Sequence, residues 1–188
     1  MNLTPEQIAF ATKAPIQHVR ANWPLILDAL EEAGINTPLV QVGMAATIAV
    51  ETGHFYPVKE IASKNPESAV YKAQQAYYPS GYYGRGYIQL TWRDNYRDAS
   101  RAIGVDLITK PDLLLEPEIS AKAAAWFFKT KTVGGTDRRR LYMACDEADW
   151  KALRRGINGP GYAKDASGLK KYLKICAELQ EALYAPFA

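Results

Sequence analysis

The most constraining feature of the chain is an apolar run, LVQVGMAATIAV at residues 39–50, which ends on a glutamate, Glu51. Pro38 comes directly before the run, and Asn36 or Thr37 can cap it, so the run is predicted to be a helix. Because its residues are apolar nearly all round, this helix should be covered on every side and lie at the centre of the fold. A carboxylate at its end is a misplaced charge, a paired structural charge or a reacting acid.

The composition is that of a globular protein with one core. The chain has 188 residues, of which 48% are hydrophobic and 23% are charged. We therefore expect one domain over residues 1–188. The net charge of +3 is too small to indicate a nucleic-acid partner. No apolar run reaches the roughly 20 residues of a membrane helix, and the start MNLTPEQIAFATKAP lacks the pattern of a signal peptide, so we expect neither membrane insertion nor a secretion signal.

Helical periodicity runs through most of the sequence. Helices predicted within residues 1–36 should pack on a central core at about 37–160, and a C-terminal helix is expected at about 165–184. Between the helices, residues 52–87 are rich in Gly, Pro, Ser, Tyr and Asn, which is typical of a loop kept for function. The fold class is therefore mainly α.

Two shorter segments determine how much β structure is expected. Residues 80–91 are the one stretch predicted to form a β element, and residues 130–140 (TKTVGGTDRRR) are predicted to be a polar loop. We therefore expect at most a short β hairpin.

The cysteines and histidines do not indicate a metal or cofactor site. Cys145 and Cys176 are too few for a disulfide framework, and His18 and His54 are far from both in sequence. We expect no cofactor, no metal and two reduced, buried thiols whose role stays open.

Glu51 and Glu60 are the main pair of candidate reacting groups. Gly53 and Pro57 lie between them, so they cannot share one uninterrupted helix, but they can face each other across a loop. Glycoside hydrolysis needs two carboxyl groups in different environments, one protonated and one ionised. Burial disfavours the charged form, which suits Glu51 to the role of proton donor. The residues alone leave a second reading open, in which Glu51 is a hydrogen-bonded structural carboxylate and Glu60 is solvated. Two glutamates at this spacing are more often of this kind than catalytic.

The stretch YGRGYIQLTWRDNY, residues 83–96, adds polar groups of the kind that bind sugars. Gly84 and Gly86 permit a close approach of the backbone. Gln89 and Thr91 alternate with apolar residues, so an extended segment would present an amide and a hydroxyl on one face. Such groups can hold an N-acetyl sugar and a water molecule. The alternative is a tight turn and short hairpin, with Thr91 as a helix cap.

Four segments, ETGHF, YYGRGYIQLTWRDNY, AIGVDLITKPDLL and RRGINGP, occur in this order along the chain. Together they resemble glycoside hydrolase family 19, that is, its chitinases and, more closely, its bacteriophage endolysins. In that family a glutamate ends a helix, a second glutamate follows in the next loop, and G-R-G-x-I-Q-[IL]-[ST]-x-x-x-N-Y comes after it. The resemblance covers roughly residues 40–160. It implies a single lysozyme-like, mainly α-helical domain.

The resemblance also implies roles for individual residues. Glu51 matches the general acid, Glu60 stands where the endolysin-like members have their second carboxylate, and Thr91 matches a hydroxyl that helps hold the nucleophilic water. The implied substrate-binding residues are Gln89, Asn95, Tyr96, Asn158 and Tyr87. Val50 stands where the chitinases have histidine, and the second glutamate comes earlier than in plant enzymes, so Glu67 stays open as an alternative to Glu60.

The implied function is that of an endolysin, a glycosidase that lyses bacteria. It would cut peptidoglycan at the β-1,4 bond between amino sugars by an inverting mechanism, which places the two carboxyl groups roughly 6.5–9.5 Å apart. We expect a monomer that is made in the cytoplasm of the host bacterium and acts on the cell wall after release. The basic clusters Arg138–Arg140, Arg154–Arg155 and Lys170–Lys171 are expected to be solvated, or else to hold the anionic wall.

Three alternatives remain open from the sequence. A chitinase would act on poly-N-acetylglucosamine with the same cleft. A lytic transglycosylase would use Glu51 alone and leave an anhydro sugar. A cell-wall-binding module without catalysis would not need Glu51. The sequence also leaves open which glycosidic bond is cut and which bacteria are attacked.

Overall fold

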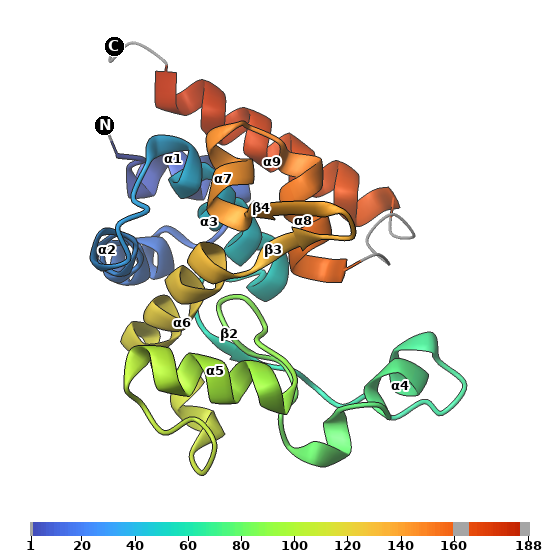
Figure 1. Ribbon diagram of the computed structural model, residues 1–188. Coiled ribbons are helices and arrows are strands. Elements are labelled where there is room, and N and C mark those ends of the chain that lie inside the picture. The colour runs from blue at the N-terminus through green and yellow to red at the C-terminus, as the bar shows by residue number, and fades with distance from the viewer. Residues whose placement is uncertain (1, 160–165, 185–188) are drawn as a thin grey trace.

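The computed structural model describes residues 2–159 and 166–184, and most of this part of the chain is helical (Figure 1). The α-helices are α1 (Pro5–Thr12), α2 (Ile16–Glu32), α3 (Pro38–Thr52), α4 (Ala69–Gln74), α5 (Arg93–Ile103), α6 (Pro117–Thr130), α7 (Leu141–Asp146), α8 (Trp150–Asn158) and α9 (Ala166–Tyr184). Two 3-10 helices are η1 (Tyr78–Ser80) and η2 (Pro111–Leu115). The strands are β1 (Val58–Lys59), β2 (Arg85–Gly86), β3 (Thr132–Gly134) and β4 (Asp137–Arg140). The predicted fold class, mainly α, is confirmed.

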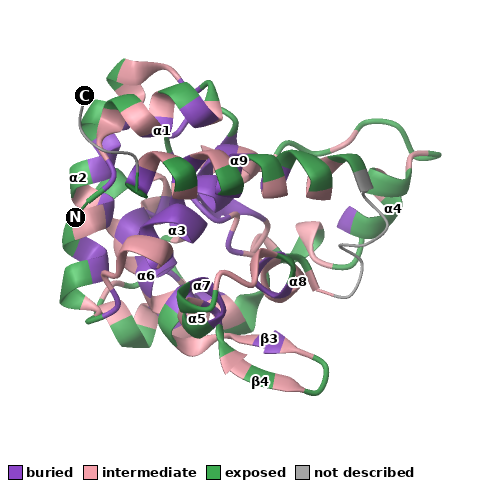
Figure 2. Cartoon of the chain, turned by 90° about the horizontal axis from the view of Figure 1, so that it is seen from above, coloured by how far each residue is buried: buried purple, intermediate pink, exposed green. Residues whose placement is uncertain are grey.

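Helix α3 is the centre of the fold, as the apolar run predicts. The Thr37 side chain accepts a hydrogen bond from the Val40 backbone N–H, Pro38 occupies the first turn, and Gly53 ends the helix in the left-handed conformation. Every residue from Val40 to Ala49 is buried, because α1, α7, α8 and α9 pack around the helix (Figure 2). The helix therefore delivers Glu51, in its last turn, from a rigid and fully packed element.

The first two helices are part of the same core as the rest of the chain. The Thr4–Gln7 capping box starts α1, which packs on α2 and α9. Helix α2 continues through Pro24 and packs along α6. The buried apolar residues form one continuous cluster that runs in sequence from Leu3 to Leu183.

The β structure differs from the sequence prediction. Strand β2 lies within residues 80–91, where a β element was expected, and it pairs antiparallel with β1, which lies outside that stretch. Strands β3 and β4 form a second antiparallel pair within residues 130–140, so the prediction of a polar loop there was wrong. Gly135 and Thr136 make the turn, Gly134 and Gly135 both have positive φ, and Val133 is buried against the core. Two adjacent glycines between two short strand-forming segments are a signal for a β hairpin in the sequence.

The segment of residues 61–82, which includes α4 and η1, extends away from the rest of the molecule (Figure 1). It starts after β1 and returns to the body at β2, so the β1–β2 pair closes its base. We call residues 61–82 the α4 segment. It forms most of the loop-rich stretch that the sequence indicated.

The C-terminal part contains α7, α8 and α9. Ala148, with φ of 51°, lies between α7 and α8. Helix α9 corresponds to the predicted C-terminal helix, whereas residues 160–165, with the end of the RRGINGP segment, lie outside the described residues. Cys145 and Cys176 are buried free thiols. Among the described helices, none combines the length and the apolar character needed to cross a bilayer.

Candidate active site

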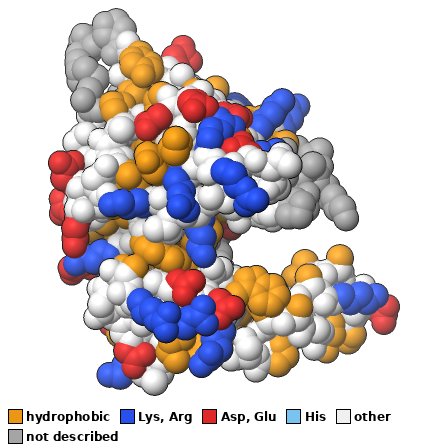
Figure 3. All heavy atoms as spheres, in the orientation of Figure 1, with side chains coloured by type: hydrophobic (Ala, Val, Ile, Leu, Met, Phe, Trp, Pro, Cys, Tyr) orange, Lys and Arg blue, Asp and Glu red, His pale blue; other side chains and the backbone are white. Residues whose placement is uncertain are grey.

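A cavity of about 510 Å³ brings together most of the residues that the sequence singled out. Figure 3 shows the molecule hollowed between its upper body and the α4 segment. The cavity is lined by Glu51, Glu60, Tyr77, Gly84, Ile88, Gln89, Leu90, Thr91, Trp92, Asn95, Phe127, Ile157 and Asn158. Its volume lies in the range of sites for small molecules or short segments of a polymer. Both candidate carboxylates therefore face one space, although they come from different elements.

Glu51 lies at the C-terminal end of α3 and is ion-paired. Its Oε1 accepts a hydrogen bond of 2.5 Å from Nη1 of Arg154 on α8. The two side chains are 16% and 9% exposed, so the pair is largely withdrawn from water. The Arg154 guanidinium also lies 5.3 Å from the centre of the buried Tyr172 ring. The expectation of a solvated Arg154 was wrong, because the side chain is buried and fixes the carboxyl group.

Glu60 follows β1, and both of its carboxylate oxygens accept hydrogen bonds. Oε1 accepts from the Tyr77 hydroxyl at 2.6 Å and from Nε2 of Gln74 at 2.9 Å. Oε2 accepts from the Gly84 backbone N–H at 2.9 Å, and the Glu60 backbone N–H donates to the Gly84 carbonyl. The donors are neutral, in contrast to the guanidinium at Glu51. The two carboxylates thus have different surroundings, which is what the paired acid and base of a glycosidase require.

Tyr77 remains a hydrogen-bond donor over the accessible pH range. Burial raises the pKa of Tyr77, and the hydrogen bond to Glu60 raises this pKa further. The phenol is therefore protonated and donates to the Glu60 carboxylate.

Gly84 and residues 88–92 line the cavity together with the two carboxylates. A Cβ on Gly84 would lie 2.7 Å from Oε1 of Gln89 and 3.2 Å from Oε2 of Glu60, so glycine is required here. Gln89 has φ of 52° and its Nε2 donates to the Val58 carbonyl at 2.9 Å. The hydroxyl of Thr91 donates to the Gln89 carbonyl, also at 2.9 Å. Arg85 and Leu90 form an antiparallel bridge around a turn at residues 87–89, so this segment is the tight turn and short hairpin given as the alternative, although Thr91 does not cap α5. Gln89 and Thr91 nevertheless line the cavity.

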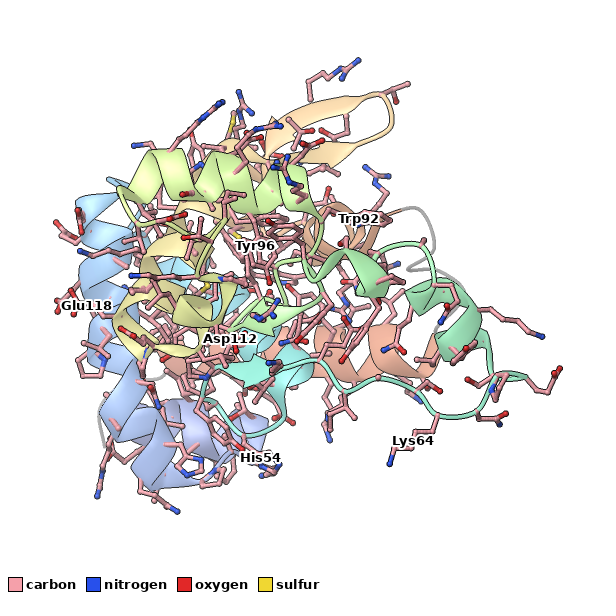
Figure 4. The ribbon with its side chains drawn as sticks, turned by 90° about the horizontal axis from the view of Figure 1, so that it is seen from below. His54, Lys64, Trp92, Tyr96, Asp112 and Glu118 are labelled. Atoms are coloured by element: carbon pink, nitrogen blue, oxygen red, sulfur yellow. The ribbon has the colours of Figure 1, made fainter. Side chains whose placement is uncertain are left out.

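Trp92 is a cavity residue that the sequence analysis did not select. Its side chain is exposed and meets the Tyr77 ring edge-on at a centroid distance of 5.3 Å. Figure 4 shows Trp92 on the side of the body that leads to the α4 segment. Its backbone, with φ of 77° and ψ of 134°, is unusual for a residue with a side chain. Backbone strain of this kind is often kept at functional sites, and here it arises only in the folded chain.

Asn95 and Asn158 line the cavity from two different helices. Asn95, on α5, donates through Nδ2 to the Thr91 carbonyl at 2.8 Å and so fixes the loop. Asn158 is the last residue of α8 and is exposed. Both residues line the cavity, and their role in substrate binding stays a prediction.

Tyr87 and Tyr96, which the resemblance offered as substrate-binding residues, do not reach the cavity. Both side chains are 0% exposed. The Tyr87 hydroxyl donates to Oδ1 of Asn22 at 2.6 Å, and the Tyr96 hydroxyl donates to the Tyr83 carbonyl at 2.6 Å. Figure 4 shows Tyr96 among the side chains of the body, apart from Trp92. As a correction, both are core residues that support the cavity wall from behind.

Arg85 and Glu67 also lie outside the cavity lining. Arg85 is 3% exposed and donates to Asp112 at 2.6 Å and to the Tyr96 hydroxyl at 3.0 Å, so it braces the loop from inside. Glu67 is 88% exposed in its side chain and lies 3.5 Å from Nζ of Lys72. Of the two candidates for the second carboxylate, the cavity contains Glu60.

Within residues 2–159 and 166–184, no three His, Cys, Asp or Glu side chains come together as metal ligands would. The cavity instead offers two carboxyl groups, amides, hydroxyls and an aromatic ring. Such a set can exchange protons and hold a polyhydroxylated ligand without a metal.

Known proteins resemble this chain in sequence and in fold. The family model described as class I chitinase, of glycoside hydrolase family 19, matches residues 41–137. Endochitinase 2 of Gossypium hirsutum is 49% identical over 71 residues, which are 35% of this chain and 23% of that protein. The chain thus matches less than a quarter of the length of that relative.

Two solved structures share the fold. Chitinase C from Streptomyces griseus HUT6037 gives a TM-score of 0.66 at 23% identity, covering 95% of this chain and 76% of that one. A bacterial family 19 chitinase gives a TM-score of 0.67 at 23% identity, covering 94% of each chain. Because the family model extends over more than half of the sequence and includes both glutamates, the chain belongs to glycoside hydrolase family 19, the family of the class I chitinases.

Proposed function

We propose that this protein hydrolyses the β-1,4 bond between N-acetylated amino sugars in peptidoglycan, with Glu51 as the proton donor and Glu60 as the base. The observation that carries the proposal is that both carboxylates line one cavity in different surroundings. Arg154 engages Oε1 of Glu51, so a proton carried by this group lies on Oε2. Glu60 accepts from neutral donors only, which stabilise a carboxylate able to receive a proton from water.

The second carboxylate favours a hydrolase over a transglycosylase. A transglycosylase needs no group that activates water, because the 6-hydroxyl of the sugar attacks. Here Glu60 is held by three side-chain and backbone donors and faces the same cavity as Glu51. An inverting hydrolase uses such an arrangement, with water between substrate and base. Thr91 and Gln89, which line the same cavity as the two carboxylates, are suited to hold that water and the acetamido group.

Two polymers fit the cavity chemistry. Peptidoglycan is proposed because the block YYGRGYIQLTWRDNY and the spacing of the glutamates resemble the endolysins of the family. Chitin is the second candidate, because the relatives that match in sequence and in fold are named chitinases. Among the described residues, the cavity lining contains no lysine or arginine. Binding of the substrate in the cavity therefore depends on neutral groups that peptidoglycan and chitin have in common.

The roles of the glutamates are tested with Glu51→Gln and Glu60→Gln. Each amide keeps the size of the side chain but cannot exchange the proton, and general acid–base catalysis contributes about 10²–10⁴-fold. We expect turnover to fall by that factor in both variants, with folded proteins by circular dichroism. Glu67→Gln is the matched control and should retain wild-type turnover. A folded Glu51→Gln variant with full activity would leave Glu51 a structural carboxylate.

A further inference from the structure

The carboxylate of Glu60 joins two parts of the molecule. Gly84, whose N–H donates to Oε2, belongs to the loop of the body that lines the cavity. Gln74 and Tyr77, which donate to Oε1, belong to the α4 segment that extends away from the body (Figure 1). Two of the three donors to this carboxylate therefore come from the α4 segment, and the third comes from the body.

The orientation of Gln74 is fixed by its own contacts. Its Oε1 accepts from the Ser63 backbone N–H at 2.7 Å, which determines which end of the amide carries the hydrogens. Its Nε2 then donates to the Ile61 carbonyl and to Glu60, both at 2.9 Å. The side chain is 3% exposed although it lies in the α4 segment. A buried amide with all of these contacts orders the first residues of the segment around Glu60.

Tyr77 is fixed in a similar way on the cavity side. Its ring packs edge-on against Trp92, and its hydroxyl donates to Oε1 of Glu60 at 2.6 Å, which is the usual length of a charge-assisted hydrogen bond between hydroxyl and carboxylate. With two donors on Oε1, the carboxylate plane cannot rotate freely. Oε2 accepts one bond from Gly84 and is the oxygen with greater capacity to accept a proton from water.

Resting on the proposed function of Glu60, we propose that Tyr77 and Gln74 are positioning residues that hold the Glu60 carboxylate for attack by water, which makes the α4 segment a part of the catalytic apparatus. Neither residue needs to touch the reacting atoms for this purpose. Loss of either donor lets the carboxylate rotate and removes stabilisation of its charge. The effect should appear in turnover and not in substrate affinity.

The test is a double-mutant cycle with Tyr77→Phe and Glu60→Gln, assayed on whichever of peptidoglycan strands and chitin oligomers the wild type cleaves. Tyr77→Phe keeps the ring and its contact with Trp92 but removes the hydroxyl. Because a charge-assisted hydrogen bond is lost, we expect kcat to fall about tenfold while KM stays within about twofold. On the Glu60→Gln background the same change should lower kcat by less than about twofold, because the two residues act as one unit.

Two further variants make the result specific. Tyr71→Phe, in α4 and outside the cavity lining, removes a different tyrosine hydroxyl of the α4 segment and should retain wild-type kcat. Gln74→Met, of similar size and without donors, should reproduce the loss of kcat independently of Tyr77.

The outcomes separate this inference from the proposed function. An inactive Glu60→Gln with a fully active Tyr77→Phe overturns the positioning role and leaves the base assignment intact. If Tyr77→Phe lowers kcat by the same factor in the wild type and in Glu60→Gln, the positioning role is also overturned. Tyr77 would then act on the substrate directly. An active Glu60→Gln overturns the base assignment itself. The expected pattern is a loss of kcat that depends on Glu60.

Discussion

Nη1 of Arg154 lies 2.5 Å from Oε1 of Glu51, and this contact joins α8 to the end of α3 at the cavity. The pair has little exposure to water, so each charge depends on the other. Arg154→Met removes one partner of this largely buried contact and should therefore lower the free energy of unfolding by about 3–5 kcal/mol. Urea unfolding followed by circular dichroism measures this value.

Arg155→Met is the matched control for that prediction. Arg155 is 38% exposed in its side chain and lies 3.3 Å from Oδ2 of Asp137, so its removal should cost no more than about 1 kcal/mol. If Arg154→Met and Arg155→Met lower the free energy of unfolding equally, the Glu51–Arg154 pair is not more buried than the Asp137–Arg155 pair.

Two substitutions of Trp92 distinguish the contribution of its ring to substrate binding from the cost of its backbone conformation to stability. Removal of the ring in Trp92→Ala or Trp92→Gly should raise KM about tenfold, as expected for the loss of an aromatic contact. Glycine tolerates the φ of 77° at this position and alanine does not, so Trp92→Gly should be more stable than Trp92→Ala by about 1 kcal/mol. Thermal unfolding and initial rates test both parts. The strain argument does not hold if the alanine variant is the more stable one.

Gly84→Ala should impair catalysis through geometry. The added Cβ would come within 2.7 Å of Oε1 of Gln89, whose amide is fixed by the Val58 carbonyl, and within 3.2 Å of Glu60. The loop must shift, and kcat should fall at least about tenfold. Gly104→Ala is the control, with φ of 71° and no heavy atom within 4 Å of the added Cβ. It should cost about 1 kcal/mol of stability and leave kcat unchanged. The same kcat for both variants would argue against a tight cavity wall.

Asp137 should contribute to stability in acid. The hydrogen bonds from Arg139, with Arg155 nearby, lower the pKa of Asp137 from 3.8 to about 2. A carboxyl with a lowered folded pKa stabilises the fold above its unfolded pKa, and this stability is lost as the pH falls through the folded value. The thermal midpoint of the wild type should thus fall between about pH 4 and pH 2. Asp137→Asn should show a smaller fall over that range, and an identical fall in both proteins would remove Asp137 as the cause.

The sequence predicts the elements whose signals are local and strong. The apolar run before Glu51, with Pro38 and Gly53 at its ends, is sufficient to predict a buried α3. The cavity residues Glu51, Glu60 and Gln89 were found because acid–base chemistry and the block around Gly84 limit the possibilities.

Other features depend on tertiary contacts that no local pattern contains. Arg154 resembles any solvated arginine in sequence, and its burial follows only when α8 packs beside α3. Tyr96 and Tyr87 match a substrate-binding pattern, yet their hydroxyls find partners inside the core. The hairpin of β3 and β4 was missed although Gly134 and Gly135 signal its turn, because the charged run Arg138–Arg140 suggested a polar loop.

The central claim, hydrolysis of peptidoglycan by a carboxylate pair, is tested most directly by mass spectrometry of the fragments that the wild type releases from purified sacculi. Water attack activated by Glu60 predicts fragments with reducing ends, and none above background from the Glu51→Gln variant. The mass of the reducing sugar also identifies which glycosidic bond is cut. Fragments with 1,6-anhydro ends would contradict the water-based mechanism, and intact sacculi alongside cleaved chitin oligomers would contradict peptidoglycan as the substrate.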